Sequence, residues 1–270
     1  MRQDLKFRII SSNVRVDTTS RFYHEHKWSE RKHHIIDMLS NHAKNKPSLI
    51  GLQELKHHQL KDLISGLNDK SEYPWSYYGV GRDDGVTKGE YAPIFYQPAK
   101  WELLNTTTKW LSTTPDKPSK FSGAACTRIV TMTTFKNLET GISINMLNTH
   151  YDHKSESARG LASELIMEFI KLIPNDYKTF LSGDFNSISS DASYKTLVKQ
   201  LKDTREIASK KLSYMNTYTG FEPADIHDVI DFIWCQDDVN IETYNVIDTW
   251  TEQGFRCTDH RPVIVDVVTH

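Results

Sequence analysis

The sequence is poor in cysteine, and its three cysteines, Cys126, Cys235 and Cys257, form neither a CxxC pair nor an even set. This composition argues against a disulfide framework and against a zinc site, and it suits a reducing compartment. The first residues lack the apolar segment of a signal peptide, and no apolar run approaches the length of a transmembrane helix. We therefore expect a cytoplasmic protein without a membrane segment, with a nuclear location as the alternative.

An excess of charge of one sign is also lacking, because the formal net charge at pH 7 is only -2. Proteins that bind long nucleic acids usually carry a basic face, since the neutralisation of phosphates dominates that affinity. The total charge gives no support to a nucleic-acid scaffold as a stable partner and mildly favours a small substrate.

Low-complexity segments and linkers rich in Gly, Ser or Pro are absent from the sequence as well. The clearest loop, residues 113–120, is too short to separate domains. We therefore expect a single catalytic domain over residues 1–270 and a monomer.

What the sequence does contain is an alternation of strand-like and helix-like patterns. Apolar and alternating runs predict strands at residues 7–14, 48–52, 75–80, 92–96, 128–135, 142–147, 179–181, 230–235 and 263–268. Apolar periodicity predicts helices at residues 29–41, 60–67, 155–173 and 191–200. The apolar face of the third helix is predicted to hold Leu161, Leu165, Ile166, Phe169 and Ile170. Such an order indicates layers of helices and sheets.

Polar residues stand at the ends of many of these strands. The segment Leu181–Ser187 places Asp184 and Asn186 directly after an apolar run and a glycine. Similar polar groups occur in Ser12–Val14, Gly51–Glu54, Asn148–His150, Ile230–Ile233 and Thr258–Pro262. A set of strand ends that carry carboxylates, amides and histidines is typical of a site for a hard cation or a phosphate.

In this order, the motifs resemble those of the endonuclease/exonuclease/phosphatase superfamily of metal-dependent phosphoesterases, which includes deoxyribonuclease I. The resemblance runs from about Phe7 to Val268. The closest likeness is to a less characterised subgroup of bacteria and fungi that carries stretches like Gly81–Gly85 and Gly89–Tyr96. Gly81–Gly85 is not a P-loop, because it lacks the Gly-Lys-Ser/Thr ending. The resemblance implies a four-layer α/β/β/α sandwich with two packed mixed sheets and the site at their top.

The resemblance also implies a metal site for Mg²⁺ or Mn²⁺. Glu54 matches the main metal-ligand glutamate, and Asn13 and Asp259 are the expected further ligands. Mg²⁺ binds a few carboxylate oxygens, retains waters and takes phosphate oxygens as ligands, which suits this set. Arg15 stands where abasic endonucleases carry a carboxylate, and Asp17 is a candidate to replace that carboxylate.

Two histidine–carboxylate pairs are implied as catalytic groups. His150 is expected to contact the scissile phosphate and to be held by Glu90, and His260 is expected to be oriented by Asp231. A carboxylate on one imidazole nitrogen fixes the tautomer and leaves the other nitrogen for the substrate.

The remaining site residues follow from the same resemblance. Asp184 and Asn186 match the pair that positions the attacking water and the phosphoryl oxygens, and Arg128 matches a phosphate-contacting arginine. Asp152 and His153 are candidates for a second metal site or for outer contacts.

The expected function is hydrolysis of a phosphate monoester or diester, with a small substrate preferred. A 3'-5' exoribonuclease resembling the deadenylases is the alternative, and a binding module with a dead site is a second alternative. Either Asp184 or His260 can serve as the general base, and the motifs fit one metal ion or two.

Overall fold

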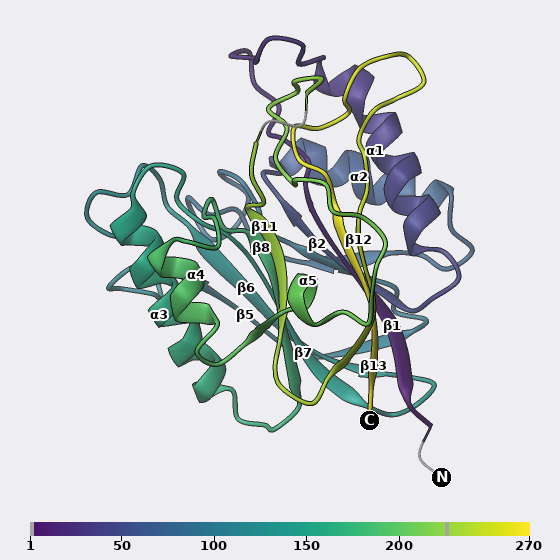
Figure 1. Cartoon of the computed structure of the whole chain (residues 1–270), viewed down its shortest axis with the longest axis vertical. Helices are drawn as coiled ribbons and strands as arrows, with labels where there is room; N and C mark the ends of the chain where they lie inside the picture. Colours follow the sequence, from purple (N-terminus) through teal and green to yellow (C-terminus); the bar gives the residue numbers. More distant parts are fainter. Residues whose placement is uncertain (1–2, 225–226) are drawn as a thin grey trace.

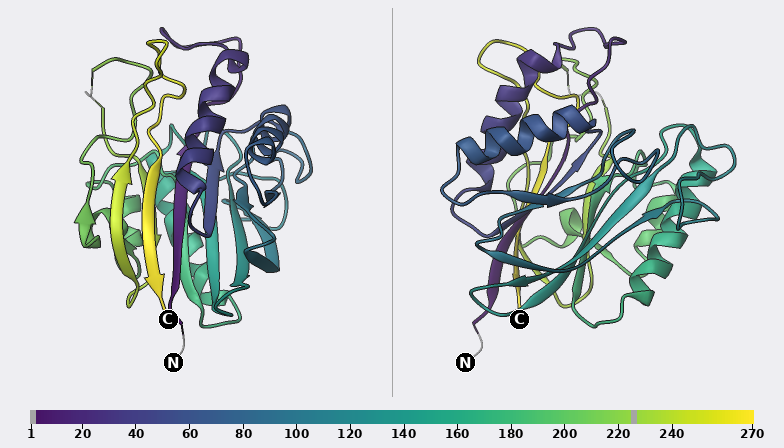
Figure 2. Two further views of the ribbon diagram at one scale, coloured as in Figure 1. Left: turned by 90° about the vertical axis from the view of Figure 1, so that its right-hand side faces the viewer. Right: turned by 180° about the vertical axis from the view of Figure 1, so that it is seen from behind.

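The computed structural model describes residues 3–224 and 227–270. Two β-sheets pack face to face, and helices cover the outer face of each sheet (Figures 1 and 2). This arrangement is the four-layer α/β/β/α sandwich implied by the resemblance, so the predicted fold is confirmed.

The first sheet is mixed and contains the first and the last strand of the chain. In hydrogen-bonded order its strands are β10 (Lys210–Lys211), β12 (Asn240–Val246), β13 (Val263–Thr269), β1 (Leu5–Asn13), β2 (Ser48–Gln53), β4 (Ile94–Tyr96) and β3 (Ser76–Tyr78). Strand β1 runs parallel to β2 and antiparallel to β13. Strand β2 lies between β1 and β4 with both faces of the sheet covered, which explains why it is buried along its whole length and has an apolar middle.

The second sheet is also mixed. Its strands, in order, are β5 (Trp101–Trp110), β6 (Ile129–Asn137), β7 (Ser143–His150), β8 (Lys178–Asp184), β11 (Asp231–Cys235) and β9 (Lys202–Asp203). Strands β7 and β8 are parallel, and β11 is antiparallel to β8.

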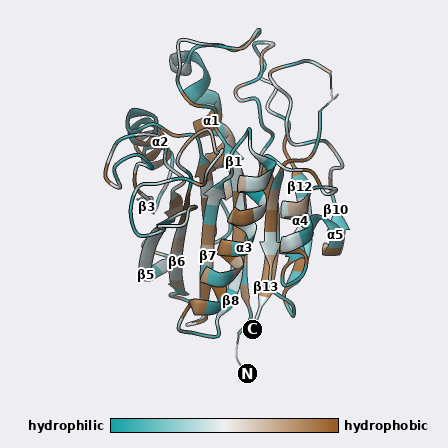
Figure 3. Ribbon diagram, turned by 90° about the vertical axis from the view of Figure 1, so that its left-hand side faces the viewer, coloured by the Kyte–Doolittle hydropathy of each residue, from teal (hydrophilic) through white to brown (hydrophobic). Residues whose placement is uncertain are grey.

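Helices cover the two outer faces of the sandwich. The helices are α1 (Trp28–Ala43), α2 (His57–Asp69), α3 (Glu156–Leu172), α4 (Ala192–Leu197) and the short α5 (Thr204–Ile207). Helices α1 and α2 pack on the first sheet, and α3 packs with α4 on the second. Figure 3 shows α3 and α4 lying over strands that are coloured largely as hydrophobic. Ser155 begins α3 as its N-cap, where its side chain accepts a hydrogen bond from the Ala158 backbone N–H.

Three large hydrophobic clusters fill the spaces between the four layers. The central cluster joins the facing sides of the two sheets, where Phe7 of β1 packs edge to face on Phe180 of β8 at 5.4 Å. The other two clusters lie between each sheet and its helices. No helix in the described part of the chain is long and apolar enough to span a membrane.

Most predicted elements agree with the structure to within a few residues, but some predictions were wrong. Strands β5 and β12 were missed, because β5 contains a polar run and half-buried positions that break the strand pattern. The predicted apolar face of α3 was also shifted. Leu161 is 42% exposed, and the buried face includes the small residues Ala158 and Ala162 instead.

The topology brings the polar strand ends together at one edge of the sandwich. The parallel pairs β1–β2 and β7–β8 end at this edge. Because β11 is antiparallel to β8, its first residue, Asp231, lies beside the last residue of β8, Asp184. Because β13 is antiparallel to β1, the residues that precede β13 also lie at this edge.

Candidate active site

The predicted site residues come from strand ends in both sheets. Asn13, His150 and Asp184 are the last residues of their strands, and Asp231 is the first residue of β11. Glu54 follows β2 directly and has a left-handed backbone with φ of 65°, so the chain turns sharply where the carboxylate leaves the sheet. A non-glycine residue in this region of conformational space is strained, and such strain concentrates at functional sites.

A side-chain amide connects the carboxylates of the two sheets. Asn13 Nδ2 donates hydrogen bonds to Glu54 Oε1 at 3.1 Å and to Asp184 Oδ2 at 2.9 Å. Its Oδ1 accepts from the Arg15 backbone N–H at 2.9 Å, and Glu54 Oε2 accepts from the Val16 N–H at 3.0 Å. In this orientation Asn13 positions the carboxylates, so it has to turn its amide before its oxygen can bind a cation.

His260 and Asp231 form a buried pair. His260 Nδ1 lies 2.8 Å from Asp231 Oδ2, and His260 Nε2 lies 3.7 Å from Asp184 Oδ2. Burial disfavours the charged imidazole, but the charges of Asp231 and Asp184 outweigh burial and hold the pKa of His260 well above its usual value. These charges favour the cationic form of His260, and its Nε2 faces Asp184.

The second predicted pair has a different geometry. His150 Nδ1 lies 3.9 Å from Glu90 Oε2, beyond hydrogen-bond distance, whereas Arg82 binds both oxygens of Glu90 at 2.7 and 3.0 Å. In the structure Glu90 is therefore held by an arginine, and it approaches His150 without bonding to it. Burial, followed by the charges of Arg128 and Arg82, holds the pKa of His150 well below its usual value, so this imidazole is neutral.

Arg82 was not assigned a role from the sequence, although it belongs to the Gly81–Gly85 stretch. Its backbone N–H donates to the Glu90 carbonyl at 3.0 Å, which pairs the two ends of a compact loop. Asp84 holds that loop by accepting three backbone N–H groups at 2.8 to 2.9 Å. The sequence did contain a signal for this ion pair, because an arginine and a glutamate stand eight residues apart on either side of a glycine-rich turn.

The carboxylates of the site are crowded. Glu54 Oε1, Asp184 Oδ2 and His150 Nε2 lie close together, with His150 Nε2 at 3.4 Å from Asp184 and 3.9 Å from Glu54. Burial raises the pKa of Asp184 to about 7, an effect that His260 opposes and that Asp231 and Glu54 reinforce. Burial and the charge of Glu54 likewise raise the pKa of Asp259 to about 6.

Glu54 itself keeps a low pKa in these surroundings. Burial opposes its ionisation, but the hydrogen bonds from Val16 and Asn13 and the charge of Arg15 outweigh burial. An anionic Glu54 beside two carboxylates that resist ionisation is an arrangement that a divalent cation would stabilise.

Asn186 and Arg128 lie at the margin of this group. The Asn186 backbone N–H donates to Asp184 Oδ1 at 2.9 Å, and its side-chain Nδ2 donates to the Tyr151 carbonyl at 3.0 Å. Arg128 is 5% exposed, and its Nη2 lies 3.3 Å from His153 Nδ1. Its Nε and Nη1 have no hydrogen-bond partner among the described residues.

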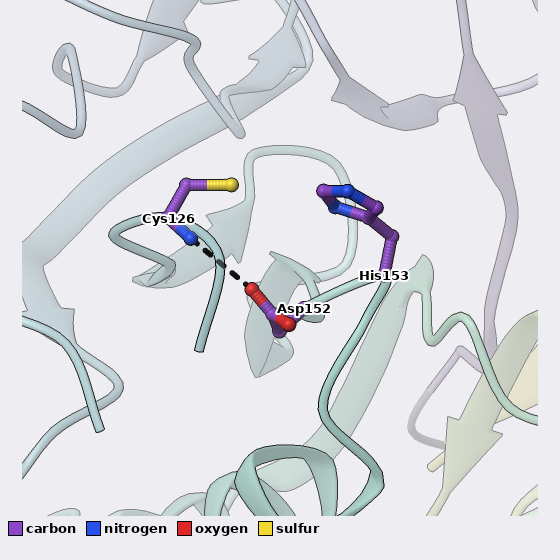
Figure 4. A group of neighbouring side chains, drawn as sticks. All are labelled: Cys126, Asp152 and His153. Carbon is purple, nitrogen blue, oxygen red and sulfur yellow. Dashed lines mark hydrogen bonds between the residues drawn. The ribbon is translucent and has the colours of Figure 1, made fainter. Parts of the chain in front are cut away.

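Cys126, Asp152 and His153 form a neighbouring group (Figure 4). The two oxygens of Asp152 already accept four backbone N–H groups, from residues 125, 126, 154 and 155. A carboxylate with both oxygens used in this way has little capacity left for a cation. The structure therefore assigns Asp152 to holding two loops together, and it does not support a second metal site here.

The structure also shows what Arg15 contacts at the position where abasic endonucleases carry a carboxylate. Arg15 lies between two carboxylates, 3.3 Å from Glu25 and 3.8 Å from Glu54, and its guanidinium stacks over the Phe22 ring at 4.4 Å. Asp17 bonds to His58 at 2.9 Å on the surface, so its carboxylate is engaged outside the group that surrounds Glu54.

The comparisons with known proteins agree with this geometry. A model of the endonuclease/exonuclease/phosphatase family matches residues 10–260, so the chain belongs to that family and is a phosphoesterase. An uncharacterised protein of Acanthamoeba polyphaga mimivirus is 29% identical over 186 residues, which make up 67% of each chain.

Solved structures resemble the whole chain. A family member from Bacteroides thetaiotaomicron is 30% identical, with a TM-score of 0.92 and 99% of both chains covered. A mannosyl-6-phosphatase from Bacteroides thetaiotaomicron VPI-5482 is also 30% identical, with a TM-score of 0.88, over 97% of this chain and 100% of the other. The human nocturnin catalytic domain shares the fold, with 18% identity and a TM-score of 0.72 over 99% of this chain and 97% of the other.

Proposed function

We propose that this chain is a Mg²⁺- or Mn²⁺-dependent hydrolase of a small phosphate ester, acting as one catalytic unit. The supporting observation is the buried series of contacts from Asp231 through His260, Asp184 and Asn13 to Glu54. This series places the His260 imidazole, whose pKa is raised by the neighbouring carboxylates, beside Asp184, whose ionisation burial opposes. Core packing alone gives no reason to bury so many ionisable groups together.

The donor set fits a hard divalent cation. Glu54 and Asp259 would hold the metal, with Asn13 as a further ligand after its amide turns. Carboxylate and amide oxygens are the ligands that Mg²⁺ prefers. When bound, such an ion would polarise the phosphoryl group and stabilise the leaving oxygen.

The chain's own residues supply the remaining chemistry. Asp184, oriented by the hydrogen bond from the Asn186 backbone N–H, would hold or deprotonate the attacking water. His260 would donate from Nε2 to a phosphoryl oxygen, because Asp231 holds its other nitrogen. His150 would bind a phosphoryl oxygen as a neutral imidazole, with Glu90 and Arg128 behind it.

A sugar phosphate is the substrate class that we favour. The net charge of -2 does not favour tracking along RNA, and one structural neighbour of 30% identity is a mannosyl-6-phosphatase. The likeness to nocturnin, at 18% identity, concerns the fold, so the exoribonuclease alternative becomes an outcome of the test.

The test is a panel of hexose phosphates, phosphodiesters and oligoribonucleotides, assayed with Mg²⁺, with Mn²⁺ and with a chelator. We expect metal-dependent release of inorganic phosphate from a hexose phosphate and little hydrolysis of RNA. Metal-dependent shortening of RNA without sugar-phosphate turnover would replace this proposal by the exoribonuclease. Metal-independent turnover would contradict the metal assignment.

A further inference from the structure

Tyr218 lies beside the catalytic histidine, on a segment that the sequence did not single out. This segment runs antiparallel to the one that carries His260, and the two residues face each other in an isolated β-bridge. On either side of the bridge, the Arg261 N–H donates to the Thr217 carbonyl at 2.6 Å, and the Thr219 N–H donates to the Asp259 carbonyl at 2.7 Å.

The two threonines fix the backbone of Tyr218 to the site. Thr217 Oγ1 accepts the backbone N–H of Asp231 at 3.1 Å, and Thr219 Oγ1 donates to the Asp259 carbonyl at 2.9 Å. Both threonines are fully buried, while Tyr218 is half-buried. Side chains alternate along an extended segment, so Tyr218 points to the opposite side from its neighbours.

The ring of Tyr218 packs against two histidines. Its centroid lies 5.0 Å from the His260 ring and 4.9 Å from the His227 ring. Gly220 follows with φ of 58°, and a Cβ atom at this position would lie 3.3 Å from the Tyr218 hydroxyl. The glycine therefore leaves space at the hydroxyl end of the ring.

The hydroxyl of Tyr218 has no hydrogen-bond partner among residues 3–224 and 227–270. Other tyrosine hydroxyls are used inside the protein, because Tyr151 bonds to Ser163 at 3.0 Å and Tyr194 bonds to Asp203 at 2.9 Å. The phenol of Tyr218 nevertheless faces a charged environment. Burial, followed by the charge of Asp259, raises its pKa to about 12, and Arg15, Glu54 and Asp184 also act on it.

We propose that Tyr218 is a substrate-binding residue whose hydroxyl donates a hydrogen bond to an oxygen of the substrate phosphoryl group. The carboxylates of the site repel a phosphate, so a neutral donor beside His260 is well placed to compensate. Tyrosine is protonated at neutral pH, and its hydroxyl therefore serves as a donor without a proton transfer. This inference rests on the proposed function, because it assumes a phosphate ester in the site.

The test compares Tyr218→Phe with Tyr214→Phe. Tyr214 is a matched control because it is 72% exposed, and its backbone carbonyl, not its side chain, accepts a hydrogen bond from Arg205. Two quantities are measured with Mg²⁺ present: kcat/KM for the best substrate of the panel, and the inhibition constant or thermal-shift affinity of inorganic phosphate.

We expect Tyr218→Phe to lower both kcat/KM and the affinity for inorganic phosphate by about ten- to a hundredfold, the usual range for a hydrogen bond to a charged group. Tyr214→Phe should change neither quantity. Because phenylalanine preserves the packing against His260, a purely structural role of Tyr218 predicts unchanged values for both variants.

The outcomes separate this inference from the proposed function. If the wild type hydrolyses a phosphate ester and Tyr218→Phe matches it in both measurements, the role of Tyr218 is refuted and the function stands. If the wild type binds inorganic phosphate without hydrolysing any ester, and Tyr218→Phe loses that binding, the function fails and Tyr218 stands. A wild type that neither binds phosphate nor hydrolyses an ester overturns both.

Discussion

Replacing Asp184 by asparagine should stabilise the metal-free protein while removing its activity. Asp184 is 1% exposed, and burial raises its pKa from 3.8 to about 7. Each pKa unit corresponds to about 1.4 kcal/mol, so ionised Asp184 lowers the free energy of unfolding by roughly 4 kcal/mol above pH 7. Asparagine carries no charge and so removes this destabilisation. It also weakens the hydrogen bonds that Asn13 and Asn186 donate to this position, which costs about 1–2 kcal/mol of the gain.

The sign of the pH dependence follows from the raised pKa. Between about pH 4 and pH 7 the folded state binds more protons at Asp184 than the unfolded state, so this residue lowers the stability of the wild type as the pH rises. Asp184→Asn lacks this dependence. At pH 4 the variant should be about 1 kcal/mol less stable than the wild type because of the weakened hydrogen bonds, and at pH 8 it should be about 2–3 kcal/mol more stable.

The assay is urea unfolding of both proteins in a chelator, from pH 4 to pH 8. Asp176→Asn is the control, because Asp176 is exposed, and such surface changes stay within about 0.5 kcal/mol. Added Mg²⁺ should stabilise the wild type more than Asp184→Asn, since a cation relieves the repulsion that the substitution has already removed. An Asp184→Asn variant that is less stable than the wild type at pH 8 would refute the argument.

Four further predictions concern the metal, the histidine, the second sheet and the substrate. Glu54→Gln should lower activity by orders of magnitude and raise the Mg²⁺ concentration needed for half-maximal rate, and an unchanged metal titration would exclude Glu54 as a ligand. His260→Ala and Asp259→Ala should each lower kcat by about 10²–10⁴ without loss of the folded circular dichroism spectrum; near-normal turnover in both would contradict the assignment of this motif. Burial raises the pKa of Asp203 to about 6, so Asp203→Asn should gain stability relative to the wild type as the pH rises from 4 to 6 in urea unfolding, and a flat difference would contradict this shift. Oligoribonucleotide binding, measured with Ca²⁺ in place of Mg²⁺, should be weak and respond little to salt, whereas tight binding that falls steeply with salt would favour the exoribonuclease.

The strand ends of the site were predictable from the sequence, because the signal there is local. A polar residue directly after an apolar run, as at Asp184 and Glu54, marks the end of a buried strand whether or not the fold is known. The pairing of His260 with Asp231 came from the resemblance, and the 2.8 Å contact agrees with it.

The residues that the sequence did not reveal act across long separations or through loops. Arg82, and not His150, bonds to Glu90, and a sequence pattern does not show which of two basic side chains a carboxylate binds. The sequence did not indicate that Tyr218 belongs to the site, because a lone tyrosine between two threonines is typical of an ordinary strand. Its role depends on the neighbouring segment, 42 residues further along the chain, that carries His260.

The proposed reacting groups and the loops around them belong to different parts of this molecule. The proposed reacting groups stand on strand ends fixed by two hydrogen-bonded sheets, and such positions change little within a fold, whereas loops supported by a scaffold vary and select ligands. The family match therefore informs the hydrolysis more than the substrate. Arg15 and Phe22 lie on one loop, where Arg15 approaches Glu54. Arg82 lies on a second loop and binds Glu90, and Tyr218 lies on a third segment and packs against His260. Substrate preference should accordingly change when these loops are exchanged with those of a relative, while the Glu54, Asp184 and His260 requirements should remain.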